Sequence, residues 1–299
     1  EQEMSEEMRS LVQPLGVTCV DAHEIRNLSP SRILNGWELK AYAIIHSRFK
    51  EVLLLDADNV AVVDPTFLFD SPEYREHGAV FWPDYGQLNP RRSIWDLTGV
   101  PYRNEPEFES GQIVLDKQRC WRPLMLAMWM NEHSDFWYRH IHGDKDTFHL
   151  AWHRLGFSYA MPSTPIHSLQ GVMCQHDFDG RRIFQHRNSH KWSLDGANIQ
   201  VDGFEYEEEC IHYLAALSRS WHNRPTRQFR VGEANDAERD IAASLVHQAW
   251  IYRRIGFDRR PMTFSLDGSI HEGAAGCETR WDLRCTSDSV NLMLAGRDG

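Results

Sequence analysis

Four apolar residues run directly into two acids in the stretch Glu51-Val52-Leu53-Leu54-Leu55-Asp56-Ala57-Asp58. An apolar run of this length is typical of a strand that is covered on both faces. Because side chains alternate along a strand, Asp56 and Asp58 are predicted to point the same way if the strand continues through them. The run ends at the acids, which places both carboxylates at the carboxyl end of the strand, where open α/β sheets bind ligands.

Helices and further strands are predicted around this strand. Apolar periodicity indicates helices at 3–14, 31–48, 117–136 and 144–155. Short apolar runs indicate strands at 17–20, 79–82 and 107–115. Such alternation is typical of a mostly parallel α/β sheet flanked by helices.

The C-terminal part changes character. Polar residues with Pro225 and Gly232 give 222–236 the composition of a linker. A helix at 237–254 and a hairpin at 262–270, with Asp-Gly at the turn, are predicted beyond it. We therefore expect one domain over residues 1–230 and a small α+β module over 231–299.

Composition limits the classes of function. The chain has 299 residues, 41% hydrophobic and 25% charged, which is ordinary for a globular protein. Its formal net charge of −11 argues against nucleic acid as a partner. No apolar run approaches the roughly 20 residues that span a bilayer. Six cysteines without a CxxC pair indicate free thiols in a reducing compartment, so a cytoplasmic location is expected.

The two acids predict a metal site. Two close carboxylates repel each other unless a cation neutralises them, and Mg²⁺ and Mn²⁺ prefer such oxygen ligands. His186 is a candidate third ligand, because imidazole also binds Mn²⁺. Arg187 and Lys191, in the same basic loop, suit phosphate oxygens. The competing interpretation is that one of the two acids caps a loop and the other is solvated, and that the basic segment around His186 is an ordinary surface loop.

Two other segments carry candidate site residues. The segment Gly143-Asp144-Lys145-Asp146 lies at a helix start. One interpretation is structural, with Asp144 as the N-cap and Asp146 in the first turn. The alternative is that Asp146 and Lys145 face a sugar and a phosphate. In Glu109-Ser110-Gly111-Gln112, the glycine marks close approach of a ligand or another backbone. Glu109 is then a candidate to contact such a ligand or the hydroxyl of an acceptor.

A zinc site is a weaker alternative. Cys174 and His176 are close in the sequence and could combine with His167 or His186. No second closely spaced ligand pair accompanies them, which argues against this interpretation.

Taken together and in this order, these segments resemble the α-mannosyltransferase family of fungal α-1,3-mannosyltransferases and their bacterial relatives. The segments are Leu34–Lys40, Leu53–Asn59, Glu109–Gln112 and Gly143–Asp146. The resemblance implies a GT-A fold, a Rossmann-like nucleotide-binding sheet with a DxD motif. In a looser way, His186, Lys191 and Trp192 are similar to a late His-Lys-Pro-Trp motif of glycogenin-like and galactosyltransferase enzymes, without the proline.

The resemblance implies roles for these residues. It implies transfer with retention at the anomeric carbon, metal at Asp56, Asp58 and His186, and Lys191 and Arg187 assisting the diphosphate. Asp146 is then expected to hold sugar hydroxyls, and Glu109 or Gln112 to orient the reacting partners. Relatives begin with a βαβ unit that this chain lacks, so the resemblance predicts an incomplete donor pocket and an exposed sheet flank that favours a homo-oligomer.

The leading interpretation is a retaining glycosyltransferase that is assisted by Mn²⁺ or Mg²⁺. GDP-mannose is the first expected donor and a UDP-hexose the second, with a glycan or small molecule as acceptor. The Golgi lumen replaces the cytoplasm if the chain is a eukaryotic relative without its N-terminal anchor. One alternative is an inactive protein that binds a nucleotide sugar or a glycan. A metal-dependent hydrolase is another, which would need a second ligand cluster near Asp56.

Overall fold

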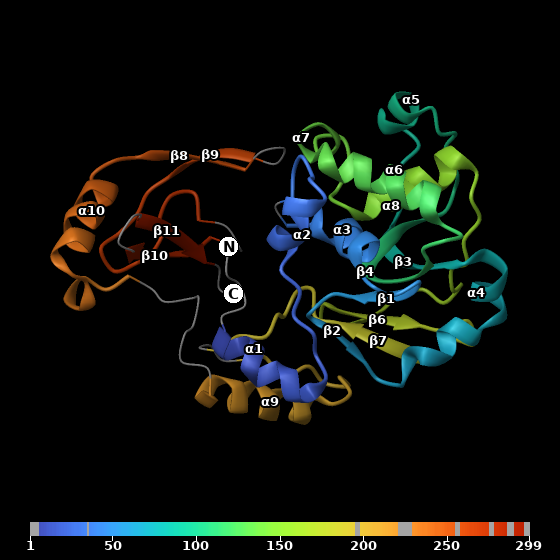
Figure 1. Ribbon diagram of the computed structural model, residues 1–299, viewed down its shortest axis with the longest axis horizontal. Helices are drawn as coiled ribbons and strands as arrows, with labels where there is room; N and C mark the ends of the chain where they lie inside the picture. Colours follow the sequence, from blue (N-terminus) through green and yellow to red (C-terminus); the bar gives the residue numbers. More distant parts are fainter. Residues whose placement is uncertain are drawn as a thin grey trace. The chain divides into compact units, whose positions relative to one another are not determined.

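The computed structural model describes residues 6–34, 36–194, 198–220, 229–254, 258–274, 278–285 and 290–295. They form two compact units (Figure 1). The larger unit contains Val20–Ser189 and Val201–Tyr206, and the smaller unit contains Glu1–Cys19, His190–Gln200 and Glu207–Gly299. Asn35, and Pro225 with its neighbours 222–228 in the predicted linker, lie outside the described residues.

The larger unit is built on a three-stranded sheet in the order β1 (Glu51–Leu55), β4 (Pro106–Asp116), β3 (Ala79–Gln87). β4 runs antiparallel to both neighbours. The prediction of a mostly parallel sheet is therefore wrong: among the described residues, the one parallel pairing is the isolated bridge between Val80 and Ala160. An apolar run indicates that both faces of a strand are buried, and burial carries no information on strand direction.

A second, four-stranded sheet lies in the same unit. Its order is β2 (Asn59–Ala61), β7 (Arg182–His186), β6 (Val172–His176), β5 (His167–Leu169), and all neighbours are antiparallel. The chain passes from the first sheet to the second between Leu55 and Asn59. Asn59 pairs with His186, which brings the end of β7 to this crossing point.

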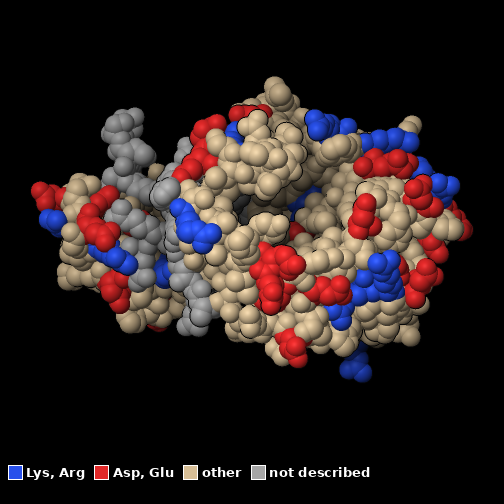
Figure 2. Space-filling model, turned by 90° about the horizontal axis from the view of Figure 1, so that it is seen from below, with Lys and Arg blue, Asp and Glu red and all other residues tan. Residues whose placement is uncertain are grey.

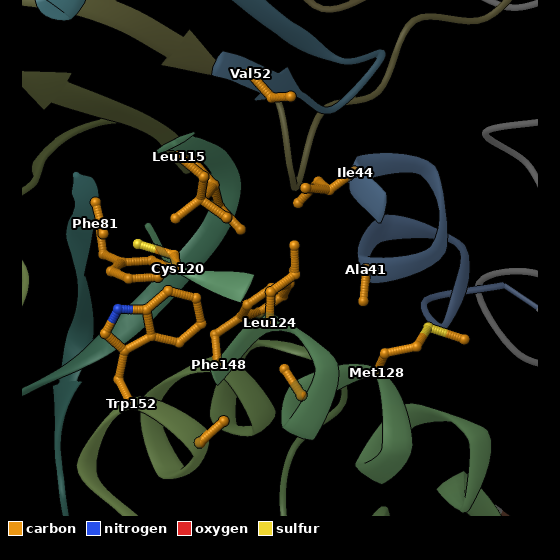
Figure 3. Packing of buried hydrophobic residues seen from close by; sticks show 14 of the residues in the cluster. Ala41, Ile44, Val52, Phe81, Leu115, Cys120, Leu124, Met128, Phe148 and Trp152 are labelled. Atoms are coloured by element: carbon orange, nitrogen blue, oxygen red, sulfur yellow. The ribbon is translucent and has the colours of Figure 1, made fainter. Parts of the chain in front are cut away.

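Both faces of the three-stranded sheet are covered. On one face lie helices α3 (Leu39–His46), α6 (Trp121–Glu132) and α8 (Lys145–Leu155), as Figure 1 shows. The apolar core between them and the sheet is drawn in Figure 3 and includes Ala41, Ile44, Phe81, Leu115, Leu124, Phe148 and Trp152. On the other face, Val80, Trp82 and Val114 belong to one buried cluster with Ile183 and Phe184 of β7. The unit therefore has a helix layer and two sheet layers.

Shorter helices connect these layers. They are α2 (Ala22–Leu28), η2 (Pro65–Asp70), α4 (Pro72–His77), α5 (Ile94–Thr98) and α7 (Ser134–Trp137). The predicted helix at 31–48 begins only at Leu39, and the one at 117–136 is interrupted at His133, which has a non-helical backbone. The strand predicted at 17–20 is irregular. Cys120 and Cys174, both buried, are free thiols, as the sequence predicts.

The smaller unit has its own core of Phe229, Ala234, Ala242, Met262, Phe264, Ile270, Trp281 and Leu283. Its helices are α1 (Glu6–Val12), η1 (Gln13–Leu15), α9 (Glu207–Ser220), η3 (Val231–Glu233) and α10 (Asp236–Val246). Its two hairpins are β8 (Trp250–Arg254) with β9 (Asp258–Met262), and β10 (Arg280–Cys285) with β11 (Val290–Ala295). The helix predicted at 237–254 therefore ends early, and the rest of it is a strand. The division expected at 230/231 stays a prediction.

Two general features bear on partners. None of the described helices is long and apolar enough to cross a membrane. On the face shown in Figure 2, acidic and basic side chains are interspersed, so a phosphate backbone would meet mixed charge there.

Candidate functional site

Asp56 and Asp58 lie in the turn that connects the two sheets of the larger unit. β1 ends at Leu55, so a turn and not strand alternation brings the two carboxylates together. The turn is fixed from β4, because the carbonyl of Gly111 accepts hydrogen bonds from the amide of Asp56 at 2.9 Å and from Asn59 Nδ2 at 3.0 Å. The two carboxylates do converge, but through a turn, because the strand does not continue past Leu55.

His186 completes a group of three residues that could each supply a metal ligand. Its Nε2 lies 3.0 Å from Asp58 Oδ1 and 3.9 Å from Asp56 Oδ2. One ligand atom from each residue lies within 4.8 Å of the other two. The position of His186 follows from its pairing with Asn59, and from the hydrogen bond that the amide of Arg187 donates to the carbonyl of Asp58 at 2.9 Å. The sequence predicted this proximity correctly.

Glu109 approaches His186 from the opposite side. Its Oε1 lies 3.6 Å from His186 Nδ1 and accepts a hydrogen bond from the amide of Gly111 at 2.7 Å. A Cβ atom at position 111 would lie 2.5 Å from His186 Nδ1, so only glycine leaves room for the ring. The glycine in this strand therefore marks close approach of a side chain, where the sequence suggested a ligand or another backbone.

The electrostatics of His186 follow from its neighbours. Burial lowers the pKa of the imidazole, but hydrogen bonds and attraction to Asp58 and Glu109 outweigh this and raise the pKa to about 9. In turn, although burial opposes it, the His186 contact holds the pKa of Glu109 below its ordinary value. Without a cation the imidazole is therefore protonated at neutral pH, and a metal must displace that proton.

Sequence reasoning missed Lys40, which α3 directs at the same turn. Its Nζ donates to Asp56 Oδ2 at 2.8 Å and to the carbonyl of Ser110 at 3.2 Å, and lies 3.8 Å from Asp144 Oδ2. Asp144 stands at the N-cap of α8 but caps no amide. Burial, which the Lys40 charge opposes, raises the pKa of Asp144 to about 6. Lys40 belongs to the segment Leu34–Lys40, but no pattern in the sequence indicates that it pairs with Asp56.

Asp146 and Lys145 belong to a second ionic group. Asp146 Oδ2 accepts from Arg92 Nη2 at 2.7 Å, and Lys145 contacts Asp84 and, at 2.8 Å, Glu107 Oε2. Arg92 and Asp84 are further residues that sequence reasoning missed. The other oxygen of Asp146, Oδ1, is buried and has no hydrogen-bond partner among the described residues.

The remaining predicted residues are placed as follows. Gln112 is fully buried, and its Oε1 accepts from Asn59 Nδ2 at 2.7 Å, while its Nε2 has no partner among the described atoms. The Arg187 side chain is fully buried and lies over the Phe204 ring at 5.2 Å. Lys191 belongs to the smaller unit, so its contact with a diphosphate stays a prediction.

Two residue groups in the described part of the chain could hold a metal ion. One is Asp56, Asp58 and His186, and the other is Glu105, His149 and His153. The structure does not bring Cys174 and His176 into such a group. The zinc alternative at those residues therefore finds no support within the described residues.

A pocket of about 330 Å³ lies beside the second ionic group. It includes Asp84, the partner of Lys145. Its other lining residues are mainly apolar and include Pro83, Tyr85, Pro106, Met161 and Ile166. A mainly apolar wall with a few polar groups is typical of small-molecule sites.

Comparison with known proteins gives consistent matches. Residues 1–106 and 100–190 match the Mannosyl_trans3 family of mannosyltransferases. The sequence is 25% identical to alpha-1,2-mannosyltransferase MNN5 of Saccharomyces cerevisiae, over 51% of this chain and 36% of that protein. It is 28% identical to alpha-1,2-mannosyltransferase MNN22 of Candida albicans, over 45% of this chain and 30% of that protein. The chain thus spans about a third of the length of these curated relatives.

Proposed function

Since the chain belongs to the Mannosyl_trans3 family of mannosyltransferases, we propose that it transfers a mannosyl residue from a nucleotide-sugar donor to a glycan hydroxyl. The observation that carries the proposal is the convergence of Asp56, Asp58 and His186 at the turn between the two sheets. GDP-mannose is the first expected donor and a UDP-hexose the second.

The donor atoms of this group fit Mn²⁺, with Mg²⁺ as the alternative. Two carboxylates and one imidazole are ligands that Mn²⁺ accepts, and both cations add phosphate oxygens readily. When bound, the cation would stabilise negative charge on the departing diphosphate as a Lewis acid. We propose that Asp58 and Asp56 hold the cation. His186 becomes the nitrogen ligand once its imidazole has lost the proton that Asp58 stabilises.

Two buried side chains offer atoms for the sugars. Asp146 is held by Arg92 through Oδ2, which leaves Oδ1 to accept a hydrogen bond from a donor-sugar hydroxyl. Gln112 is held by Asn59 through Oε1, which leaves Nε2 to donate to a hydroxyl. Because an unpaired buried polar atom is unfavourable, a ligand that satisfies both atoms gains affinity.

We propose transfer with retention, as the family resemblance implies. The acceptor oxygen forms its bond to the anomeric carbon on the face from which the diphosphate leaves, and the hydroxyl proton passes to a departing phosphate oxygen. In this scheme the chain positions both partners and supplies no nucleophile. We propose an α-1,2 linkage ahead of the α-1,3 linkage first expected, since MNN5 and MNN22 are named alpha-1,2-mannosyltransferases.

The wider assignments are also proposals. We propose a GT-A-type donor site formed where β1 and β2 meet, because the turn with Asp56 and Asp58 follows a strand that packs against apolar clusters on both faces. Of the two compartments raised by the sequence, we favour the Golgi lumen, since the relatives are fungal mannosyltransferases. The cytoplasmic location has no support among them.

The test uses the full chain with Mn²⁺ and labelled GDP-mannose or UDP-hexoses. We expect turnover with GDP-mannose, and Asp58→Ala should abolish metal-dependent donor binding in calorimetry, whereas the exposed Asp202→Asn should not. Unchanged metal-dependent affinity in Asp58→Ala would refute the site. Metal-dependent donor binding without turnover would favour the alternative, an inactive nucleotide-sugar-binding protein.

A further inference from the structure

A second cluster of metal-ligand types lies in the larger unit, apart from the DxD turn. His149 and His153 are one turn apart on α8, and Glu105 lies just before β4. Both imidazole Nε2 atoms face the same carboxylate oxygen, Glu105 Oε1, at 2.8 and 2.9 Å. One ligand atom from each of the three residues lies within 4.8 Å of the others.

Tyr159 adds a fourth possible ligand atom to the cluster. The hydroxyl of Tyr159 donates to Glu105 Oε2 at 2.9 Å and lies 3.2 Å from His153 Nε2. Two histidines at i and i+4 project from one face of a helix, so α8 presents both rings to the same point. Four oxygen and nitrogen atoms therefore surround one small volume.

From this geometry we infer a Zn²⁺ site held by Glu105, His149 and His153, with Tyr159 or a water as fourth ligand. Two imidazoles and one carboxylate are a common zinc ligand set with an open fourth position. The set has one carboxylate where the DxD turn has two, so it favours a softer cation than Mg²⁺.

Burial and charge agree with this assignment. The two imidazole side chains are 1% exposed, whereas Glu105 is 23% exposed, which leaves a route for an ion. Burial is the main factor that lowers the pKa of His149. The Glu105 carboxylate supplies a negative charge that a cation would balance.

The competing explanation is a carboxylate that accepts three hydrogen bonds, from two imidazoles and a phenol. It requires both rings to present Nε2–H to one oxygen. A metal ion would replace these two shared protons and hold the same three residues. The cation would then join α8, whose first turn carries Lys145 and Asp146, to the segment that leads into β4.

The experiment isolates this site from the DxD turn. The full chain with Asp58→Asn is freed of metal by a chelator, titrated with Zn²⁺ alone, and analysed for bound metal. Co²⁺ then replaces Zn²⁺, because tetrahedral Co²⁺ has a characteristic visible spectrum. We expect one equivalent of Zn²⁺ and that spectrum in Asp58→Asn, and loss of both when His149→Gln is added.

Matched variants separate binding from folding. His247→Gln, an exposed histidine of the smaller unit, should keep both signals. Glu105→Gln should lose them in a chain whose circular dichroism is unchanged, which covers the case in which His149→Gln does not fold. Absence of Zn²⁺ from folded Asp58→Asn, or its retention in Glu105→Gln or His149→Gln, would overturn the inference. The outcome does not depend on transferase activity.

Discussion

The Nε2 atom of His186 lies 3.0 Å from Asp58 Oδ1, although the two residues are far apart in the sequence. Their contact depends on the short β2–β7 pairing, in which Asn59 is opposite His186. The same contact holds a proton on the imidazole in the absence of a cation. Metal affinity and pH are therefore coupled at this pair.

The first prediction concerns pH. Since Asp58 and Glu109 raise the pKa of His186 to about 9, Mn²⁺ competes with a proton below that pH. The apparent Mn²⁺ affinity should rise by about tenfold per pH unit up to about pH 9 and then level off. Calorimetric titration at several pH values measures this slope. It should disappear in His186→Gln and remain in His247→Gln, and a flat profile in the parent chain would contradict the prediction.

The same residue predicts the sign of a stability change. In metal-free protein, a raised folded-state pKa stabilises the fold fully below the unfolded value of about 6.5. This contribution is lost as the pH rises through about 9. The free energy of unfolding should therefore fall between these values in the parent chain, relative to His186→Gln. Urea titrations at both ends of the range measure the difference, and a parallel dependence in both proteins would contradict it.

Gly111→Ala should damage the site through one methyl group. The new Cβ would lie 2.5 Å from His186 Nδ1 and 2.9 Å from Glu109 Oε1, so the ring must move. We expect a loss of about 1–3 kcal/mol in stability, typical of an overpacked site, and at least about tenfold weaker Mn²⁺ binding. Gly232→Ala is the matched control, because its Cβ would meet no atom within 4 Å. Equal Mn²⁺ affinity in both variants would show that His186 is not a ligand.

Lys40→Gln should separate metal affinity from stability. The ammonium of Lys40 shares Asp56 Oδ2 with any cation at the turn, and like charges repel. Its removal should strengthen Mn²⁺ binding by about three- to tenfold at low ionic strength and should lower the metal-free melting temperature, because Asp144 loses its counter-charge. Lys50→Gln, at an exposed lysine, should change neither. Weaker Mn²⁺ binding in Lys40→Gln would mean that Lys40 chiefly orients Asp56.

Leu124→Ala tests the helix layer of the core. Leu124 is completely buried between α6 and the three-stranded sheet (Figure 3). Truncation of a buried leucine destabilises by about 2–5 kcal/mol, because apolar contacts are lost and a cavity remains. Leu28→Ala, at a leucine that is 88% exposed, should stay within about 0.5 kcal/mol of the parent chain. Urea denaturation of both variants measures the contrast, and similar values would refute the assigned core.

The convergence of Asp56, Asp58 and His186 could be predicted in part because these residues carry local signals. Asp56 and Asp58 end an apolar run, and His186 begins a basic segment of the sequence with Arg187 and Lys191. Strand direction could not be predicted, because apolar residues of β1 and β4 pack against clusters on both faces of this antiparallel sheet, as they would in a parallel one.

The residues that the sequence did not reveal contact partners from other elements of the fold. Lys40 reaches Asp56 from α3, and Arg92 reaches Asp146 from the segment ahead of α5. The sequence around Lys40 and around Arg92 does not indicate which acid each side chain contacts. The His149 and His153 spacing on α8 was a readable signal, but Glu105 joins it only through the packing of α8 against β4.

The DxD turn is the point where the chain leaves one sheet and enters the other. Asp56 follows β1 of the three-stranded sheet, and His186 ends β7 of the four-stranded sheet. A cation held by both would be thermodynamically linked to the interface between these layers, where Trp82 and Phe184 meet edge to face at 5.5 Å. Such linkage is reciprocal, so a substitution that loosens this aromatic contact would weaken cation binding without replacing Asp56, Asp58 or His186.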